Sequence, residues 1–379
     1  MKIALFNIQN IFHRHIGLVE RYADKNKVRW TEEFEALMLQ QHRSQKDYDR
    51  MRVLSHFLGF DKEMHPPCFT IKNTMGQLIL KRGVDKQIPK ASHLTNWEGW
   101  AKVDSIPINK VATLNKAKVI KRVDPDILVL IEVEDRASLL EFNGNFLVSE
   151  QISPYKQIVF LGTNDPYRRG IGVLAKEGFN LESIKTHVND FDCSGKPIFD
   201  MDLQQYKFKT IYGPDLEVLC THFSNNTGNP DFFVNRQRIQ SEYISSLFAN
   251  QQINPAKHLI LMGTLNAPAY SNAIAPIIKQ TGLKDVAKHP YFMGDLDKGK
   301  DADYFRLGAY KMGINIKQRD YLMLSNALFD AVEDCGLVRK GMWHKQQPQW
   351  KMLKSLKNET HVASEHPLVW SKLNIQNML

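Results

Sequence analysis

The segment from Leu259 to Pro268, LILMGTLNAP, joins an apolar run to a polar turn. Four large apolar residues in a row, ended by Gly263, predict a β-strand that is buried on both faces. Side chains two positions apart on a strand point the same way, so Thr264 and Asn266 are expected at one surface beyond the strand. Taken alone, the segment is also compatible with an ordinary strand followed by an Asn-Ala-Pro turn.

Five other predicted strand ends carry polar side chains. These are Asn7 after residues 2–6, Glu132 after 127–131, His222 after 216–220, Asp320 before 321–324, and Glu365 with His366 before 368–370. A carboxylate directly after five aliphatic residues is costly unless it is paired or bound to a cation, so Glu132 is a candidate functional residue, with a structural ion pair as the alternative. A histidine such as His222 or His366, taken alone, is more typical of a hydrogen-bonded core residue.

The order of the predicted elements indicates the fold class. Further strands are expected at 157–161, 171–175 and 199–208, a hairpin at 69–72 and 77–80, and helices at 31–42, 44–58, about 111–120 and 233–249. The helix near residue 120 should end before Asp124, because the residue that precedes proline is pushed out of helical geometry. Many strands without strict β-α alternation predict an α/β layered sandwich of two packed mixed β-sheets flanked by helices.

Composition excludes several classes of protein. The 379 residues are 43% hydrophobic and 10% aromatic, which is typical of a folded chain, and the formal charge of +9 favours polyanionic partners. The N-terminus turns polar too soon for a signal peptide and no apolar run is long enough to span a bilayer, so a cytoplasmic protein without membrane contact is expected. The four cysteines lack metal-type spacing.

Segments along nearly the whole chain resemble, in order, the motifs of the endonuclease/exonuclease/phosphatase superfamily, whose fold is that of deoxyribonuclease I. They are FNIQNIF at 6–12, DPDILVLIEVE at 124–134, RGIGV at 169–173, THF at 221–223 with the helix at 236–240, MGTLN at 262–266, RDYL at 319–322 and SEHP at 364–367. The resemblance implies one domain over residues 1–379. Residues of about 14–110 match least and are expected to be a lineage-specific insertion.

The resemblance also implies metal-assisted hydrolysis of a phosphoester by an attacking water molecule. Glu132 and Glu365, with Asn7 nearby, would be ligands of Mg²⁺ or Mn²⁺, since such cations require hard oxygen ligands. The expected substrate is nucleic acid, and DNA rather than RNA, although a small or lipid phosphoester remains an alternative.

The same resemblance assigns roles to the other strand-end residues. Asp320 would orient His366, which would donate to or polarise the scissile phosphate. His222 and Asn266 would add hydrogen bonds in the transition state. Together with the metal ligands, these side chains are expected to converge on one cleft.

Two substitutions fall on this chemistry. Thr264 stands in place of the GDxN aspartate that activates or aligns the water. Its hydroxyl cannot serve as a general base near neutral pH. Loss of an acid–base group typically lowers the rate by ~10²–10⁴-fold. Glu365 replaces the terminal aspartate. Gly172 also replaces an aspartate that is common in the superfamily's strand, which is expected to remove a possible partner of His222; the nearest remaining acid in that segment is Asp165.

Three explanations of Thr264 stay open. The chain could be an enzyme whose water is activated by the metal or another carboxylate, a weakened or inactive relative that acts as a phosphate- or nucleic-acid-binding module, or an engineered variant.

Two segments outside the motifs carry further charge. Arg29, Lys81 and Arg82 in the insertion are expected to lengthen a phosphate-binding surface, unless the insertion is only a cap. The stretch from Asp295 to Asp301 partly matches the pattern of a calcium-binding loop. Its glycine is one position early, so the stretch is expected to be a solvated loop.

Overall fold

The computed structural model describes two compact units, one formed by 1–11 and 109–379 and the other by 12–108. The residues it describes are 1–15, 18, 29–30, 33–34, 36–37, 40, 42–57, 69–73, 78–79, 99–103, 105–165, 167, 169–211, 213–223, 230–250, 252–254, 258–294, 318–343 and 350–375. The calcium-like segment and the pair Lys81 and Arg82 lie outside these residues. That one domain carries an insertion stays a prediction.

The first sheet of the larger unit has seven strands in the order β15-β17-β18-β1-β7-β9-β8. Their bounds are β15 Phe292–Met293, β17 Val332–Val338, β18 Leu368–Leu373, β1 Lys2–Asn7, β7 Ile127–Val133, β9 Gly170–Ala175 and β8 Gln157–Leu161. In the middle of the sheet, β1 runs parallel to β7 and antiparallel to β18. The parallel pair β1 and β7 therefore ends at one edge, where β18 begins.

The second sheet has six strands in the order β10-β11-β12-β13-β16-β14. Their bounds are β10 Phe179–Thr186, β11 Leu203–Thr210, β12 Leu216–His222, β13 Leu259–Thr264, β16 Asp320–Leu324 and β14 Lys284–Asp285. Here β12 runs parallel to β13, and β16 is antiparallel to β13. Each sheet thus contains a central parallel pair beside an antiparallel strand that begins where the pair ends.

The two sheets pack face to face through alternate side chains of their strands. Residues such as Leu5 and Val129 from the first sheet meet Val218, Ile260 and Leu322 from the second in one buried cluster. Burial of each such side chain contributes about 1.5–3 kcal/mol. In this arrangement a one-residue shift of register would turn the apolar set outward.

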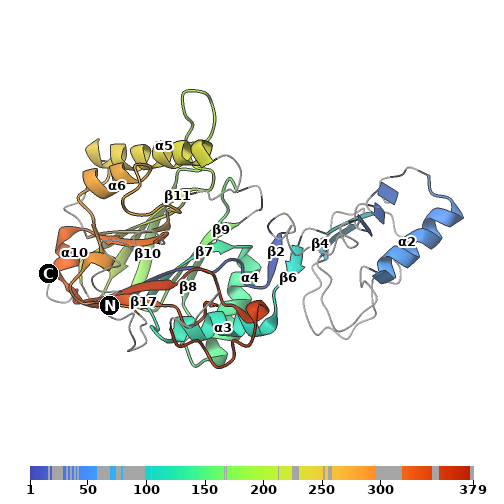
Figure 1. Cartoon of the computed structure of the whole chain (residues 1–379), viewed down its shortest axis with the longest axis horizontal. Coiled ribbons are helices and arrows are strands. Elements are labelled where there is room, and N and C mark those ends of the chain that lie inside the picture. Colours follow the sequence, from blue (N-terminus) through green and yellow to red (C-terminus); the bar gives the residue numbers. More distant parts are fainter. Residues whose placement is uncertain are drawn as a thin grey trace. The chain divides into compact units, whose positions relative to one another are not determined.

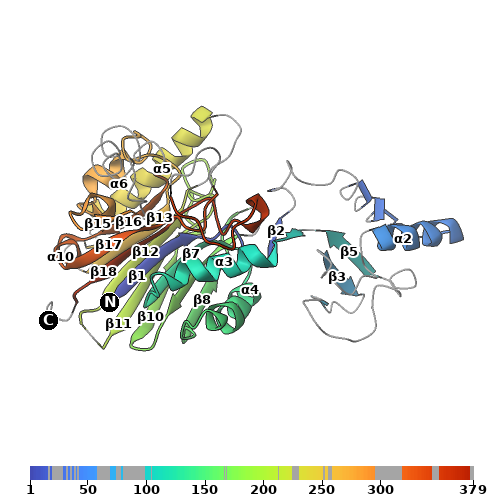
Figure 2. The ribbon, with the colours of Figure 1, turned by 60° about the horizontal axis from the view of Figure 1, so that its bottom comes forward.

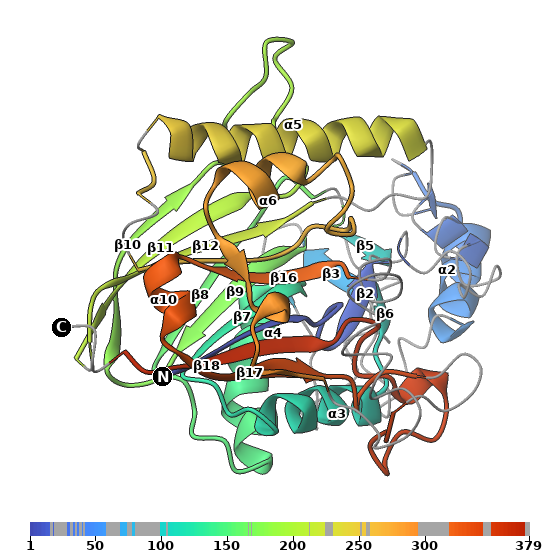
Figure 3. The ribbon, with the colours of Figure 1, turned by 60° about the vertical axis from the view of Figure 1, so that its left-hand side comes forward.

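Helices cover both outer faces of the sandwich. Helices α5 (Pro230–Ala249) and α6 (Ala275–Gln280) lie over the second sheet, whereas α3 (Lys110–Lys121) and α4 (Arg136–Glu141) lie over the first (Figures 1, 2 and 3). Ile244 and Leu247 of α5 pack on Leu219 and Leu261 of the second sheet. The predicted fold class, a layered sandwich of two mixed sheets flanked by helices, is confirmed.

Local signals explain where α3 begins and ends. The Asn109 side chain accepts a hydrogen bond of 2.8 Å from the backbone N of Val111, which caps the first turn. Beyond the last turn, Asp124 has a left-handed φ of 51°, so the helix ends before Pro125 as predicted. The short elements η3 Phe142–Leu147, η4 Val286–Lys288, α10 Asn326–Asp330 and η6 Glu359–His361 complete the larger unit.

The smaller unit contains β2 His13–His15 paired with β6 Ser105–Pro107, the ribbon of β3 Phe69–Asn73, β4 Leu78–Ile79 and β5 Gly99–Val103, and helix α2 Gln45–Phe57. Met51 and Leu54 are the buried apolar residues of α2. The predicted hairpin and second helix are confirmed. The helix expected at 31–42 lies largely outside the described residues. Among the helices that the structure describes, none is both long and apolar enough to cross a membrane.

One strand begins later than predicted. Residues 199–202 precede β11 instead of belonging to it, because α5 binds this stretch from the side. Arg236 donates to the carbonyl of Ile198 at 3.0 Å and to Asp200 at 2.8 Å, and Gln240 also contacts both residues. Arg236 and Gln240 are therefore buried despite their polarity.

Candidate active site

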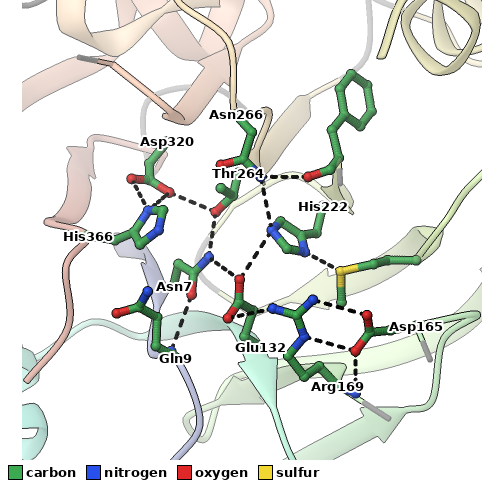
Figure 4. A network of polar contacts seen from close by, with 12 residues as sticks. Asn7, Gln9, Glu132, Asp165, Arg169, His222, Thr264, Asn266, Asp320 and His366 are labelled. Atoms are coloured by element: carbon green, nitrogen blue, oxygen red, sulfur yellow. Dashed lines mark hydrogen bonds and ion pairs between the residues drawn. The ribbon is translucent and has the colours of Figure 1, made fainter. Parts of the chain in front are cut away.

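Six strand ends meet at one edge of the sandwich. In the second sheet, Thr264 at the end of β13 is aligned with His222 at the end of β12 and with Asp320 at the start of β16. In the first sheet, Asn7 ends β1, and Glu132 lies near the end of the neighbouring β7. The predicted residues therefore come from both sheets, and the structure brings them together (Figure 4).

A continuous chain of hydrogen bonds crosses from one sheet to the other (Figure 4). The amide nitrogen of Asn7 donates to Glu132 Oε1 and to Thr264 Oγ1, both at 3.2 Å. The Thr264 hydroxyl donates in turn to Asp320 Oδ1 at 2.7 Å. Nδ1 of His366 lies 2.8 Å from Asp320 Oδ2 and 3.0 Å from Oδ1. All five side chains are buried, so their relative positions are fixed by one another.

Glu132 is held on a strained backbone. It has φ of 63° at a bulge between Ile131 and Val133, and a non-glycine residue adopts this left-handed conformation at a cost of about 1–3 kcal/mol. Gln9, Asn10 and Asn266, beside other site residues, also have positive φ. Such strain persists only where the surrounding structure imposes it, and here it turns side chains toward the site.

The charge of Glu132 is stabilised by a cationic neighbour, Arg169. Burial alone would raise the pKa of this carboxyl, but Arg169, at 3.0 Å from Oε2, and then His222, at 3.4 Å from Oε1, lower the pKa to about 2. Glu132 is therefore ionised at neutral pH. A carboxylate that remains ionised while buried can act as a ligand for a cation.

Arg169 is itself fixed by Asp165. The guanidinium makes bonds of 2.8 and 3.0 Å to the two Asp165 oxygens, and the backbone N of Arg169 adds a third bond of 3.0 Å. The Tyr167 ring lies 5.7 Å from the guanidinium carbon. Arg169 opens the RGIGV segment but was not among the predicted site residues. Its two carboxylate partners make it a positioning group for Glu132.

The predicted consequence of Gly172 is wrong. A side chain at this position would meet Leu139 of α4 at 2.9 Å, because Gly172 faces the outer helices while Ile171 and Val173 face the other sheet. An aspartate there would point away from His222. Asp165 binds Arg169, and the acid that contacts His222 is Glu132.

His222 is almost completely buried. Its Nε2 lies 3.3 Å from the amide nitrogen of Asn266, and its Nδ1 contacts the Met201 sulfur. Burial lowers the pKa of His222 to about 4, although Glu132 opposes that shift, so the ring is neutral near pH 7. Asn266 also donates to the carbonyl of Phe223 at 2.6 Å, which fixes its amide beside the ring.

The SEHP segment is bound to the loop after β1. The Ser364 hydroxyl donates to the carbonyl of Asn7 at 2.6 Å, and the backbone N of Glu365 donates to Gln9 Oε1 at 2.8 Å. The backbone N of His366 donates to Ser364 Oγ at 3.1 Å. These bonds place His366 against Asp320, whereas the Glu365 side chain is exposed to solvent. Of the predicted site residues, only Glu365 contacts the group through its backbone alone.

A buried lysine supports both loops from behind. Nζ of Lys116, on α3, donates to the carbonyl of Ile8 at 2.9 Å and to that of Ala363. These carbonyls lie next to Asn7 and Ser364 in sequence, so one ammonium group joins the two segments that carry the site. The role of Lys116 was not predicted, because its position on a helix at 110–121 gave no sign that its charge is buried.

The chain is similar to several solved structures. No protein-family model matches the sequence, and no curated protein matches it. The catalytic domain of human Nocturnin is 14% identical, with 70% of this chain and 87% of that chain covered and a TM-score of 0.46. Truncated TDP2 from Caenorhabditis elegans is 20% identical, with 69% and 91% covered and a TM-score of 0.43.

A third solved structure is an endonuclease/exonuclease/phosphatase family protein from Bacteroides thetaiotaomicron, 13% identical, with 67% of this chain and 86% of that chain covered and a TM-score of 0.43. The strand ends that carry the superfamily's motifs in the sequence are the ones that meet at this edge of the sandwich. Likeness in fold does not determine the substrate.

Thr264 departs from the superfamily's motif but takes part in the site. Its hydroxyl accepts from Asn7 and donates to Asp320, so it connects the two sheets. It supplies hydrogen bonds but no charge. Within the part of the chain that the structure describes, no group of three or more His, Cys, Asp or Glu side chains is arranged as a metal-binding cluster.

Proposed function

We propose that the chain is a metal-dependent phosphodiesterase that hydrolyses nucleic acid. The observation that carries this proposal is the hydrogen-bond chain from Glu132 through Asn7, Thr264 and Asp320 to His366, which joins a buried carboxylate to an oriented imidazole. The superfamily motifs at these positions support the same reaction.

The charges of the site fit a divalent cation. Apart from the histidines, its carboxylates outnumber its guanidiniums by two, since four acids (Glu132, Asp165, Asp320 and Glu365) face two bases (Arg169 and Arg319). A phosphate would be repelled by this balance, whereas Mg²⁺ or Mn²⁺ would neutralise it. Mg²⁺ is commonly held by one or two carboxylates with several waters, so Glu132 and Glu365, with Asn7, suffice as its ligands. When bound, the cation supplies positive charge opposite the phosphate oxygens.

The remaining side chains have roles that their contacts support. Asp320 holds Nδ1 of His366 with both oxygens and thereby orients Nε2 of the ring, the atom that would bond the phosphate. Asn266 and His222 are held at fixed positions in the site, where they would help to stabilise charge that develops in the transition state. Thr264 holds the side chains of Asn7 and Asp320 in fixed relative positions and does not act as a base.

Nucleic acid is the proposed substrate because of the chain's charge. A formal charge of +9 attracts polyanions over long distances, and DNA is proposed over RNA.

A phosphate- or nucleic-acid-binding module is the second candidate. The observation that favours it is Thr264, which fills the motif's acid position with a group that cannot activate water. In this case the site would bind phosphate groups and leave them intact.

Hydrolysis assays separate the two candidates. The purified protein is incubated with Mn²⁺ and supercoiled plasmid, short DNA and RNA single strands, or bis(4-nitrophenyl) phosphate. If the chain is a phosphodiesterase, it should hydrolyse these substrates, and both a chelator and Glu132→Ala should abolish the hydrolysis. Binding of the same oligonucleotides without any turnover would contradict it and favour the binding module.

A further inference from the structure

Arg319 is fixed at the edge of the site by its backbone. It precedes β16, and its carbonyl accepts hydrogen bonds from the backbone N atoms of Leu265 at 2.7 Å and Asn266 at 3.4 Å. Its guanidinium lies 3.4 Å from the carbonyl oxygen of Glu365. Arg319 therefore joins the turn that carries Asn266 to the segment that carries His366.

The guanidinium of Arg319 differs from that of Arg169 in its partners. Arg169 is bound by Glu132 and Asp165, so its charge is neutralised within the protein. Among the described residues Arg319 forms no ion pair, and its side chain is partly exposed. A guanidinium presents five N–H donors in a planar fork that matches phosphate oxygens, and one long bond to a carbonyl leaves most of these donors unused.

The position of Arg319 is outside the chain of bonds that runs from Glu132 to His366. Its guanidinium contacts neither the carboxylate of Asp320, its neighbour in sequence, nor the ring of His366; its polar contact is the Glu365 carbonyl. A group bound there would be near the reacting phosphate but separate from it. A polynucleotide has a second phosphate group next to the one that is cleaved, whereas a simple phosphoester has a single phosphate group.

We propose that Arg319 binds a second phosphate of the substrate, adjacent to the one that is cleaved. This inference rests on the proposed function, and it names polynucleotides, not single phosphoesters, as the substrate class. Bidentate bonds from a guanidinium to phosphate are charge-assisted and about twice as strong as neutral ones. Arg319 is thus a substrate-binding residue that selects for chain length.

Salt-dependent binding tests this inference directly. A fluorescein-labelled single-stranded DNA of about 12 nucleotides is titrated with the parent, Arg319→Gln and Arg319→Lys in chelator, at several salt concentrations. Loss of one phosphate contact should lower the slope of log Kd against log salt by about 0.7. Arg319→Gln should bind roughly 5- to 10-fold more weakly. Arg319→Lys keeps the charge and should retain most of the slope.

Arg136→Gln is the matched control, because Arg136 is an exposed arginine on α4 and should change neither quantity. An unchanged slope in Arg319→Gln, an equal change in Arg136→Gln, or no binding of the oligonucleotide by the parent would each overturn the inference. A merely structural Arg319 would weaken binding without changing the salt slope, which also contradicts it.

Hydrolysis assays of the same variants distinguish a failure of this inference from a failure of the proposed function. With Mn²⁺, Arg319→Gln should lose at least about fivefold more activity on the oligonucleotide than on bis(4-nitrophenyl) phosphate, mainly through KM. Equal losses on both substrates would contradict a second phosphate site. If the parent binds DNA with the expected salt slope but hydrolyses neither substrate, the proposed function fails and the Arg319 site stands.

Discussion

The two sheets contribute different chemistry to the same site. The first sheet supplies Glu132, a buried carboxylate that the Arg169 guanidinium, the neutral His222 ring and a strained backbone hold in place. The second sheet has Thr264 at the facing strand end, with an ordinary strand backbone and an uncharged hydroxyl. Both residues bond to Asn7. The comparison shows that two facing strand ends can share one hydrogen-bond network although only one of them, at Glu132, carries a charge.

This difference determines whether charge and hydrogen-bond geometry can be changed separately at each position. Glu132 combines charge with geometry, so its loss should affect both cation binding and the network. Thr264 supplies geometry only, and for that reason the second sheet is where charge can be added. The predictions below test the comparison in order of expected effect.

Removal of the first sheet's charge should have the largest effect. Glu132→Gln keeps the side chain's size but deprives the cation of its buried ligand, and hydrolysis of bis(4-nitrophenyl) phosphate with Mn²⁺ should fall by roughly 10³-fold. Glu182→Gln, which changes a half-exposed acid on β10, is the control. A Glu132→Gln enzyme with more than about a tenth of the parent's activity would refute the assignment of the charge to this sheet.

Addition of charge to the second sheet should raise activity. Thr264→Asp places a carboxylate where a water proton can be taken, and metal-dependent hydrolysis should rise on the order of 10²-fold over the parent. The new carboxylate would lie beside Asp320, whose Oδ1 is 2.7 Å from the present hydroxyl, so like-charge repulsion should restrict the gain to assays with a divalent cation. Thr264→Asn is the uncharged control. If Asp and Asn variants are equally active with Mn²⁺ and neither exceeds the parent, position 264 does not limit the enzyme.

The loops between the sheets depend on Lys116. Lys116→Met preserves bulk but removes the donor to the carbonyls of Ile8 and Ala363, and the free energy of unfolding should fall by about 2–3 kcal/mol. Urea unfolding of the variant is compared with that of Lys110→Met, an exposed lysine on the same helix. Equal midpoints for the two variants would show that the loops do not need the buried ammonium.

The burial of His222 should appear in the pH dependence of stability. Burial lowers the pKa of folded His222 to about 4, below its ordinary value near 6.5, so the unfolded chain binds the proton more readily. Stability is therefore present above pH 6.5 and is lost as the pH falls toward 4, by about 1–2 kcal/mol between pH 6.5 and 5. Urea midpoints of the parent and His222→Asn, measured in chelator, give this slope. A parent whose slope matches that of His222→Asn over this window would rule out a neutral buried ring.

The sequence predicted the strands more fully than the contacts between them. The apolar runs of β7 and β13 fixed the strands that end in the site, and the superfamily motifs named Asn7, Glu132 and Thr264. Their roles in catalysis stay predictions. What the sequence could not provide was the direction of side chains across the sandwich. Gly172 was assigned to the wrong face because the bulge at Glu132 and the pairing of β7 with β9 are properties of the assembled sheet.

Other residues were missed for a related reason. Arg169 and Lys116 act through partners that lie far away in sequence, at Glu132 and at Ile8 with Ala363. The local sequence around a charged residue on a loop or helix does not reveal partners that are distant in sequence. The sequence interval from β10 to β11 shows the same limit, since the first residues of the expected strand are bound by Arg236 from a helix that follows much later.

The position of β1 has a consequence for the order in which the molecule forms. Its hydrogen-bonded neighbour β18 lies at the other end of the chain, and the backbone contact from Met1 to Leu373 spans 372 residues. Closing so long a loop costs entropy before any contact repays it, and contacts of high sequence separation slow folding. During synthesis, β1 can pair with β7 early, but its other edge stays unpaired until β18 leaves the ribosome. His366 lies two residues before that strand, so the edge that carries the candidate site is expected to assemble only after β18 has been synthesised.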